Sequence, residues 1–269
     1  EHGCTEIHSV GGLHPTLPFD YYLALLRGLK ERMPQVHRKL FTAVEIHHLA
    51  RISKQSIKET LIALKEAGLD SMPGGGAEIF AQETRDKICP GKIDADEWFD
   101  IHWQAHQLGI PSNVTMLYGH IETLEDRVDH LIRIREGQTR SGGFVTFIPL
   151  AFHPENTRLA YVPSTSGLTD LRCIAVARLM LDNIPHIRAY WIMLGLKTAQ
   201  IALNFGADDI HGTVTEEKIT HMAGASSPQS VSVDQISRLI QEAGRNPVER
   251  DTLYNEVIRD GNRWHSVAA

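Results

Sequence analysis

The sequence predicts an α/β fold in which parallel strands form a TIM-type (β/α) barrel. Strand-like and helix-like hydrophobic patterns alternate along the whole chain, which is typical of a parallel sheet with helical crossovers. The chain has 269 residues and 42% hydrophobic content, enough to bury one large core. Gly- and His-rich segments end five of the strand-like runs, at junctions that line the active-site face of such a barrel.

Composition narrows the class of function. The net charge is −6 and no basic block occurs, which argues against nucleic-acid binding. No apolar run reaches about 18 residues, so no membrane span is expected. Three widely spaced cysteines, Cys4, Cys89 and Cys173, do not suggest a disulfide framework and favour a reducing cytoplasm.

Seven strands are expected, each ending at a Gly, a Pro or a polar segment. Residues 5–10 alternate polar and apolar side chains, as a strand with one buried face does. The run 144–150 is almost wholly apolar, as expected of a barrel strand buried on both faces. The seven expected strands are residues 5–10, 38–46, 69–72, 110–118, 144–150, 187–194 and 207–210.

Helices are expected between these strands. The first follows Pro18, a favourable first-turn residue, and others stop at Gly68 and Gly109. The expected helices are residues 19–32, 55–67, 77–88, 95–108, 124–135, 170–183, 197–205 and 233–243. We expect a barrel over residues 1–222, then a linker (224–230 is polar) and a helical extension packed on the barrel over 223–269, with a frayed end at 262–269.

Seven strands are one fewer than a closed eight-stranded barrel needs. The chain opens with Glu-His-Gly-Cys, without an initiator Met and in the middle of the pattern. We therefore expect the first βα unit to be missing at the N-terminus. Two exposed sheet edges would then make the chain poorly stable or prone to association.

Two glycine-rich turns follow strands. Gly11 and Gly12 would let the backbone approach a ligand, or they form an ordinary tight turn. The run of Gly74, Gly75 and Gly76 precedes Glu78, expected in the first turn of a helix. That carboxylate could bind a ribose hydroxyl or an ammonium group, or it is simply favoured there by the helix dipole.

A histidine pair stands apart from the strand ends. His102 and His106 share one face of a helix at a spacing that can chelate zinc. Trp103 occupies the position where a zinc peptidase motif has Glu, so a structural role is favoured.

Polar residues follow the central strands. His120, with Glu122, suits proton transfer or orientation of a polar ligand, or the segment merely begins a helix. His153 and Asn156 end the most apolar strand, where polar groups are costly unless they line a cavity. Lys197 could neutralise a substrate carboxylate or remain a solvated lysine.

Several of these segments together resemble the aminofutalosine synthases, radical S-adenosylmethionine (SAM) enzymes of the futalosine route to menaquinone. The matching segments are residues 10–15, 41–46, 69–80, 115–123, 148–157, 179–191, 205–213 and 242–254. The resemblance covers nearly the whole chain.

The resemblance implies a barrel of the radical SAM kind and a transferase reaction. It implies that the 5′-deoxyadenosyl radical from SAM adds to 3-[(1-carboxyvinyl)oxy]benzoate, giving 6-amino-6-deoxyfutalosine, bicarbonate and methionine. It also implies a [4Fe–4S] cluster and an electron donor such as a flavodoxin or ferredoxin. The family's cluster cysteines, C-x3-C-x2-C, are expected upstream of Glu1, and the three cysteines present do not match them. Without that loop the chain itself is expected to be inactive.

The resemblance also implies roles for individual residues. Gly11 and Gly12 would lie beside the methionine end of SAM. Its ribose, amine and adenine would be bound by residues of three segments, namely Glu45, Ser71, Gly74, Gly75 and Glu78. The aryl substrate would face His14, Tyr118, Asn156 and the catalytic candidates His120 and His153.

Three alternatives remain open. Dehypoxanthine futalosine cyclase, of the same pathway, shares the triple glycine, but His14 and the segments 43–45 and 150–153 fit the synthase better. A metal-dependent barrel hydrolase would use some of the 15 histidines. A barrel without a cluster could bind a nucleoside and catalyse nothing.

Overall fold

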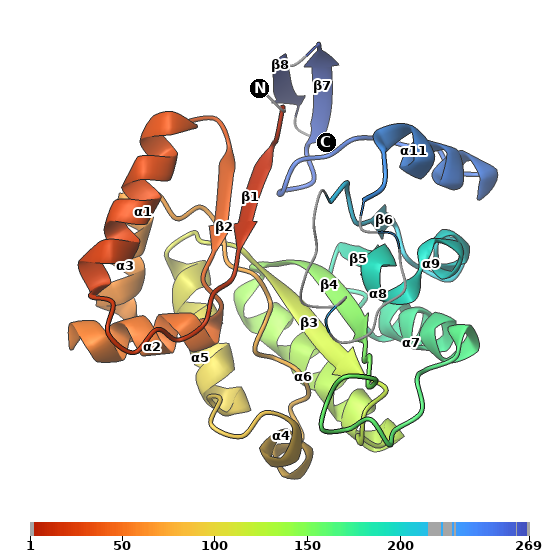
Figure 1. Ribbon diagram of the computed structural model, residues 1–269, viewed down its shortest axis with the longest axis horizontal. Coiled ribbons are helices and arrows are strands. Elements are labelled where there is room, and N and C mark those ends of the chain that lie inside the picture. The colour runs from red at the N-terminus through yellow and green to blue at the C-terminus, as the bar shows by residue number, and fades with distance from the viewer. Residues whose placement is uncertain (1–2, 215–221, 223–227, 229, 262, 268–269) are drawn as a thin grey trace.

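The computed structural model describes residues 3–214, 222, 228, 230, 231–261 and 263–267. Six strands of the described part run parallel: β1 (Glu6–Ser9), β2 (His37–Leu40), β3 (Ser112–Tyr118), β4 (Phe144–Ala151), β5 (His186–Ala189) and β6 (Asp209–Ile210). β1 pairs with β2, and β3, β4, β5 and β6 pair in that order. Parallel bridges from Lys39 to Ser71 and from Met72 to Ser112 join the two sheets. Ser71 and Met72 thus occupy the position of a seventh strand between β2 and β3. The predicted parallel α/β barrel architecture is confirmed (Figure 1).

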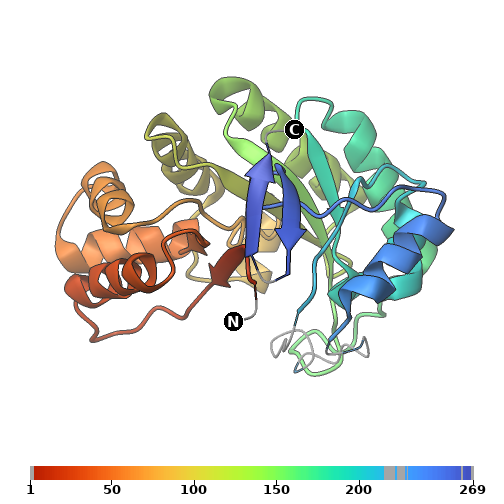
Figure 2. The same cartoon turned by 90° about the horizontal axis from the view of Figure 1, so that it is seen from above.

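Helices cover the outside of this arc of strands (Figure 2). They are α1 (Phe19–Arg32), α2 (Ala43–Ser53), α3 (Ile57–Ala67), α4 (Gln82–Ile88), α5 (Ala95–Gln107), α6 (Leu124–Ser141), α7 (Gly167–Met180), α8 (Trp191–Leu194), α9 (Leu196–Ala202) and α11 (Val233–Glu242). Five of them begin with a reciprocal capping box, at α2, α3, α5, α6 and α11. In this motif the side chains of the N-cap residue and of the residue three positions later each accept a hydrogen bond from the other's backbone N–H.

Two expected strands are shorter than their apolar runs. The run 38–46 leaves the sheet at Leu40, because Thr42 caps α2. The Glu45 carboxylate in turn accepts a hydrogen bond from the Thr42 N–H at 2.8 Å. The run 187–194 leaves it at Ala189, and Trp191 begins the short helix α8. Apolar runs of this length do not separate a buried strand from a buried helix, and capping decided both cases.

The helix expected at 77–88 begins only at Gln82. Glu78 has a φ of 43°, a left-handed conformation that no helix contains. The buried Arg85 of α4 explains the extended path before the helix. Its guanidinium donates to the carbonyls of Gly76 at 2.7 Å and Ala77 at 2.7 Å, so those carbonyls are not available to a helix.

The end expected to fray contains an antiparallel hairpin instead, β7 (Glu256–Asp260) with β8 (Arg263–Val267). It lies over the N-terminal end of the strands (Figures 1 and 2). Arg259 donates to the carbonyl of Gly3 at 2.9 Å, and Thr252 bonds Glu6 of β1. These bonds cross almost the full length of the chain, which is why a local pattern did not reveal them. The linker expected at 224–230 lies almost wholly outside the described residues.

Aromatic side chains fill the layer between the strands and helices α5 and α6. Trp98, Phe99 and Phe144 are buried there and contact one another, with ring centroids 5.1 Å apart for Trp98 and Phe99. His102 and His106 belong to this layer, where their rings bond the hydroxyl of Ser112, each at 2.8 Å. These contacts with Ser112 give His102 and His106 a structural reason to lie on the same face of α5. We call this region the outer layer.

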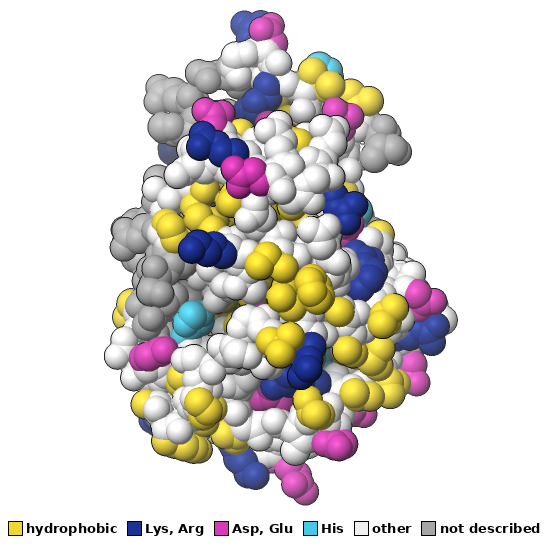
Figure 3. Space-filling model, turned by 90° about the vertical axis from the view of Figure 1, so that its right-hand side faces the viewer, with side chains coloured by type: hydrophobic (Ala, Val, Ile, Leu, Met, Phe, Trp, Pro, Cys, Tyr) yellow, Lys and Arg dark blue, Asp and Glu magenta, His cyan; other side chains and the backbone are white. Residues whose placement is uncertain are grey.

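Apolar side chains are also exposed on the face that carries α7 and α9 (Figure 3). Leu179 is 82% exposed and Leu168 is 57% exposed in α7, and Ile201 of α9 is exposed as well. Apolar surface therefore lies on the outside of the barrel at α7 and α9.

Candidate functional site

The strand register places charged side chains on the inner face of the barrel. Parallel partners project to the same face, and Glu6 pairs with His37, His8 with Lys39, and Arg188 with Asp209. A helix or loop covers the other face of each strand, so these alternate residues point inward. We call the space that they surround the lumen.

An ionic network lies at the β5–β6 side of the lumen. Asp209, which is 7% exposed, accepts from Arg188 and, at 2.8 Å, from Arg250. The Tyr254 hydroxyl donates to the same carboxylate at 2.7 Å. Burial alone would raise the pKa of Asp209, but the two guanidinium groups lower it, so the carboxylate stays charged.

A second pair lies at the β1–β2 side. Lys39 is 1% exposed and its Nζ contacts the Glu6 carboxylate at 2.9 Å. Burial lowers the pKa of Lys39 to about 8, with Glu6 opposing that effect and Arg188 adding to it. Burial would raise the pKa of Glu6, but the charge of Lys39 and its hydrogen bond hold it well below its usual range.

Two histidines line the lumen beside these pairs. His8 of β1 is exposed as a residue, but partial desolvation of its ring by the surrounding protein, together with the charge of Lys39, lowers its pKa to about 4. His211 follows β6, and burial together with Arg188 and Arg250 places its pKa well below the usual range. Both imidazoles are therefore neutral at pH 7.

The residues expected to bind SAM lie at the C-terminal ends of the first strands. The Gly11 N–H donates to Glu45 Oε1 at 2.9 Å, while Glu45 Oε2 bonds Thr42. Glu45 thus ties the loop after β1 to the start of α2. Gly12 has open space around it, since an added Cβ would have no neighbour within 4 Å. The geometry brings Gly11, Gly12 and Glu45 together at one rim of the barrel.

Close packing requires glycine at two positions of the glycine run. A Cβ on Gly74 would lie 2.7 Å from Val114 Cα, and one on Gly76 would lie 2.6 Å from the Val44 side chain. The carbonyl of Gly75 accepts from the Trp98 indole at 3.3 Å. Ser71, expected near the same ligand, bonds the His37 ring inside the lumen at 2.7 Å.

The carboxylate expected to bind a ribose or an amine has another partner. Glu78 contacts Lys92 Nζ at 2.6 Å, on the outer side of the turn. Its carbonyl accepts from the Leu117 N–H at 2.7 Å, which attaches the turn to β3. The geometry therefore separates Glu78 from the helical first turn in which we expected it.

His120 and Glu122 form a closed unit after β3. The two side chains are 2.9 Å apart, and the other ring nitrogen of His120 contacts the Leu117 carbonyl at 3.0 Å. Burial would raise the pKa of Glu122, but His120, the Gly119 N–H and Arg127 lower it to about 2. Every polar atom of this pair has a partner within the turn, which favours the structural interpretation.

Two other residues expected to face the aryl substrate also have internal partners. The Tyr118 hydroxyl donates to Asp170 Oδ1 of α7 at 2.9 Å, and burial raises the pKa of Tyr118 well above its usual range. His14 is exposed and its Nδ1 accepts from the N–H groups of Thr16 and Leu17 at 3.3 and 3.2 Å.

The last three candidates, His153, Asn156 and Lys197, lie on the other side of the same rim, after β4 and in α9. His153 Nε2 contacts the Met193 carbonyl at 3.1 Å. Asn156 is exposed and donates to the Met222 carbonyl at 2.9 Å, and Lys197 is exposed near the start of α9. The structure thus places His153 and Asn156 together on the loop after β4.

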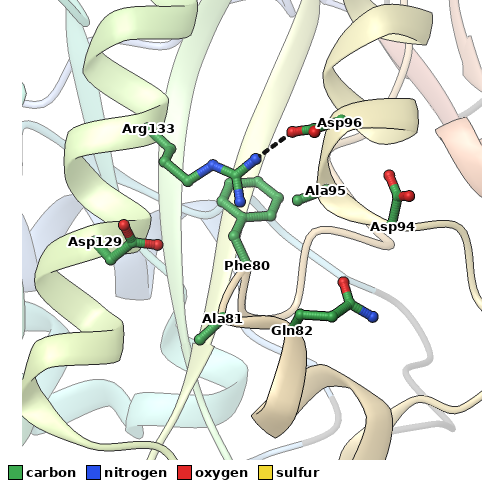
Figure 4. A pocket seen from close by; sticks show the side chains of 8 residues that line it. All are labelled: Phe80, Ala81, Gln82, Asp94, Ala95, Asp96, Asp129 and Arg133. Atoms are coloured by element: carbon green, nitrogen blue, oxygen red, sulfur yellow. Dashed lines mark hydrogen bonds and ion pairs between the residues drawn. The ribbon is translucent and has the colours of Figure 1, made fainter.

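Two surface pockets lie away from the lumen. One lies outside the strands between the segment 80–82 and the helices α5 and α6, with Arg133 2.5 Å from Asp96 across it (Figure 4). Its wall mixes Phe80 with the carboxylates of Asp94 and Asp129. The other pocket lies between α2, α3 and α5 and includes His47 and Lys54. Neither pocket includes a residue that we expected to bind SAM or the aryl substrate.

The described cysteines do not fit an iron–sulfur cluster. Cys4 precedes β1, Cys89 ends α4 and Cys173 is buried in α7. Burial raises the pKa of Cys173 to about 12, so it remains a thiol rather than the thiolate that binds metal. Among the residues that the structure describes, no group of three His, Cys, Asp or Glu side chains could hold a metal ion. In the same part of the chain, no helix is both long and apolar enough to cross a membrane.

Sequence reasoning missed the lumen residues His8, Lys39, Arg188, Asp209 and His211. A usable signal was present. Each of three strands carries charged or histidine side chains two residues apart, at 6 and 8, at 37 and 39, and at 209 and 211. In a strand that must be buried on its outer face, such alternation indicates a polar interior.

Comparisons with known proteins agree with this architecture. The model of the radical SAM superfamily matches residues 1–134, and that of the CofH/MqnC C-terminal region matches residues 141–260. An aminodeoxyfutalosine synthase of Thermus thermophilus is 55% identical over 95% of this chain and 70% of its own length.

A more distant relative and a solved structure extend the comparison. A 5-amino-6-(D-ribitylamino)uracil–L-tyrosine 4-hydroxyphenyl transferase of Methanopyrus kandleri is 44% identical over 95% of this chain and 70% of its own length. The crystal structure of methylornithine synthase superimposes with a TM-score of 0.69 at 17% identity, covering 92% of this chain and 69% of that one. That likeness concerns the fold alone.

Proposed function

Because this chain belongs to the radical SAM superfamily and, within it, to the family of the aminodeoxyfutalosine synthases, we propose that it converts SAM and 3-[(1-carboxyvinyl)oxy]benzoate to 6-amino-6-deoxyfutalosine. The observation that carries the proposal is the 55% identity to the Thermus thermophilus synthase over 95% of the chain. The family uses a [4Fe–4S] cluster and SAM.

The overall conversion balances without further groups from the chain. A carbon–carbon bond forms between the 5′-carbon of the adenosyl group and the enol carbon of the substrate, while the carbon–sulfur bond of SAM breaks and methionine leaves. After rearrangement, the carboxyl carbon departs as bicarbonate, with water supplying its third oxygen. The described cysteines do not supply the cluster's ligands, so the roles proposed for this chain are binding, orientation and exclusion of water.

The two substrates are proposed to meet at the C-terminal rim of the barrel. Gly11, Gly12 and Glu45 form the SAM side, where open backbone around Gly12 admits a ligand. His153 and Asn156, on the loop after β4, form the other side of the same rim. The lumen between them carries the charged residues and histidines that a dianionic aromatic substrate requires.

A second candidate is supported by one specific observation. The Methanopyrus kandleri transferase, whose name describes transfer of a 4-hydroxyphenyl group from L-tyrosine, covers the same share of this chain at 44% identity. The lower identity favours the synthase, and product analysis separates the two reactions.

The test is a product assay with the protein expressed from the full reading frame that contains these residues. Under anaerobic conditions with a reductant, flavodoxin or ferredoxin, SAM and the enolpyruvyl benzoate should yield 6-amino-6-deoxyfutalosine and methionine in equal amounts, measured by mass spectrometry. L-Tyrosine with 5-amino-6-(D-ribitylamino)uracil serves as the control and should give no product. A hydroxyphenyl product in place of the nucleoside would overturn the proposal.

A further inference from the structure

We propose that His8 and His211, on the two edges of the strand arc, form an anion site at the mouth of the lumen that binds a carboxylate of the aromatic substrate. The identity of the ligand rests on the proposed function. The existence of the site rests on the positions and charges of the residues around it.

The two histidines come from opposite ends of the parallel sheet. His8 lies on β1, and His211 follows β6 at the position after Ile210, one pleat above Asp209. β1 and β6 are the two ends of the strand order, and both histidines have Arg188 among their charged neighbours, so they face the same part of the lumen. The groups that face the pair are contributed by β1, β2, β5, β6 and the C-terminal segment, namely Glu6, Lys39, Arg188, Asp209 and Arg250.

The charges around the pair favour an anion. Lys39, Arg188 and Arg250 face only two carboxylates, Glu6 and Asp209, which leaves one net positive charge in an enclosed space. The imidazoles add no charge of their own, because burial, together with these cations, lowers their pKa values and keeps them neutral. A carboxylate placed between the histidines would supply the missing negative charge.

His211 has an unsatisfied hydrogen-bonding atom. Its Nδ1 is buried without a partner. His102 in the outer layer also has a buried unpartnered nitrogen, but its ring is packed between Trp98 and Phe144, with centroids 3.9 and 5.5 Å away. His211 as a residue is only partly buried, whereas His102 is fully buried, and open space surrounds Gly212 directly after His211. Leaving such an atom unpaired is costly, and a bound carboxylate would remove the cost.

An aromatic wall stands beside the proposed site. The Tyr190 ring meets the His211 ring edge-on, with centroids 4.8 Å apart, and the two residues directly follow Ala189 and Ile210, the last pair of the β5–β6 register. A benzoate whose carboxylate lies between the histidines would place its ring along this wall.

Proton uptake provides a readout specific to this site. An anion beside a histidine favours the imidazolium, so ligand binding raises the low pKa values of His8 and His211. The affinity should then rise as pH falls from 8 toward 6, and binding should take up protons from the buffer. A histidine with a purely structural role would give neither effect.

The experiment is calorimetry on the protein expressed from the full reading frame that contains these residues, with 3-methoxybenzoate, which keeps the ring and the meta ether oxygen but lacks the reactive enol group. Titrations at pH 6 and pH 8, in two buffers of different ionisation enthalpy, give the affinity and the number of protons taken up. The neutral analogue 3-methoxybenzamide tests whether the charge is required. His47→Ala, on the outer side of α2, is the matched control.

We expect saturable binding of the carboxylate, no binding of the amide and an affinity several-fold higher at pH 6. His211→Ala should weaken binding about tenfold. His211→Gln, which keeps a neutral donor and the side-chain volume, should bind at pH 8 almost normally but lose its share of the proton uptake. His47→Ala should match the parent chain.

Three results would overturn the inference: equal binding of the acid and the amide, unchanged affinity in both His211 variants, or no proton uptake. These results are independent of the product assay. If the carboxylate binds as expected and no aminofutalosine forms, the anion site stands and the proposed function falls. If the product forms and His211 has no influence on carboxylate affinity, the opposite holds.

Discussion

The outer layer, packed against β3 and β4, and the lumen, lined from β1, β2, β5 and β6, differ in how their polar groups are satisfied. In the outer layer, aromatic rings enclose histidines that bond hydroxyls and carbonyls of neighbouring elements, as His130 bonds the Thr115 carbonyl at 3.0 Å. Each region contains one histidine nitrogen without a partner, but that of His102 is enclosed by aromatic rings, whereas that of His211 lies among charged side chains that pair across strands. The comparison teaches that neither burial nor an unpaired atom alone marks a functional residue; an unpaired atom beside unbalanced charge does.

The largest effect is expected from the outer layer. Trp98 is fully buried and its ring contacts Phe80, Phe99 and Phe144. Trp98→Ala should lower the free energy of unfolding by about 4 kcal/mol, from lost burial and a large cavity. Urea denaturation measures it, with Leu124→Ala, at a residue 70% exposed on α6, as the control expected to change little. A loss below about 1 kcal/mol would show that the outer layer is not the stabilising region.

The lumen is expected to respond differently to a single change and a paired change. Asp209→Asn leaves Arg188 and Arg250 buried without their counter-charge and should cost about 3 kcal/mol. The double variant Arg188→Met with Asp209→Leu removes most of the charge and should lose less than the single variant. Urea denaturation of both compares them, and a double variant less stable than Asp209→Asn would contradict this account of the network.

The sequence predicted the elements that depend on local patterns better than those that depend on contacts between distant residues. Hydrophobic periodicity located α1 at the residues that the structure shows. It also located all seven strand positions of the barrel, because local sequence patterns determine amphipathic elements. It failed where a cap overrode an apolar run, as at Thr42, and where a long-range contact ordered the chain end, as at Arg259.

The candidate site was less predictable for a physical reason. Strand ends suggested His120 and Tyr118, but both are satisfied by partners that only the fold brings near, Glu122 in the same turn and Asp170 on α7. The residues His8 and His211 are 203 positions apart and lie on or directly after the two edge strands of the curved sheet. Their polar alternation was visible in the sequence, whereas their proximity depends on closure of the arc.

Acid should destabilise the folded chain through the buried histidines of the outer layer, among others. Burial lowers the pKa of His106 to about 4 and that of His130 to about 3, against an ordinary value near 6.5, so both are neutral in the folded chain. The unfolded chain takes up these protons below pH 6.5 and the folded chain does not, so stability is lost as pH falls from about 6.5 toward 4. Each histidine should contribute about 1 to 2 kcal/mol of the loss at pH 5. Urea denaturation at pH 8 and pH 5 measures the loss, and the difference should be smaller in His106→Gln than in the parent chain; an equal difference would rule out this source.

The smallest effect concerns glycines that the sequence alone could not tell apart. Gly74→Ala would place a Cβ 2.7 Å from the backbone of Val114, and because β3 cannot move away, the free energy of unfolding should fall by about 2 kcal/mol. Gly12→Ala meets no atom within 4 Å and should leave stability within about 0.5 kcal/mol of the parent chain. Thermal unfolding of the two variants compares a glycine required by packing with one that leaves the rim open to a ligand. If Gly12→Ala were the more destabilising change, the loop after β1 would be a packed element, and its proposed place on the SAM side of the site would lose its support.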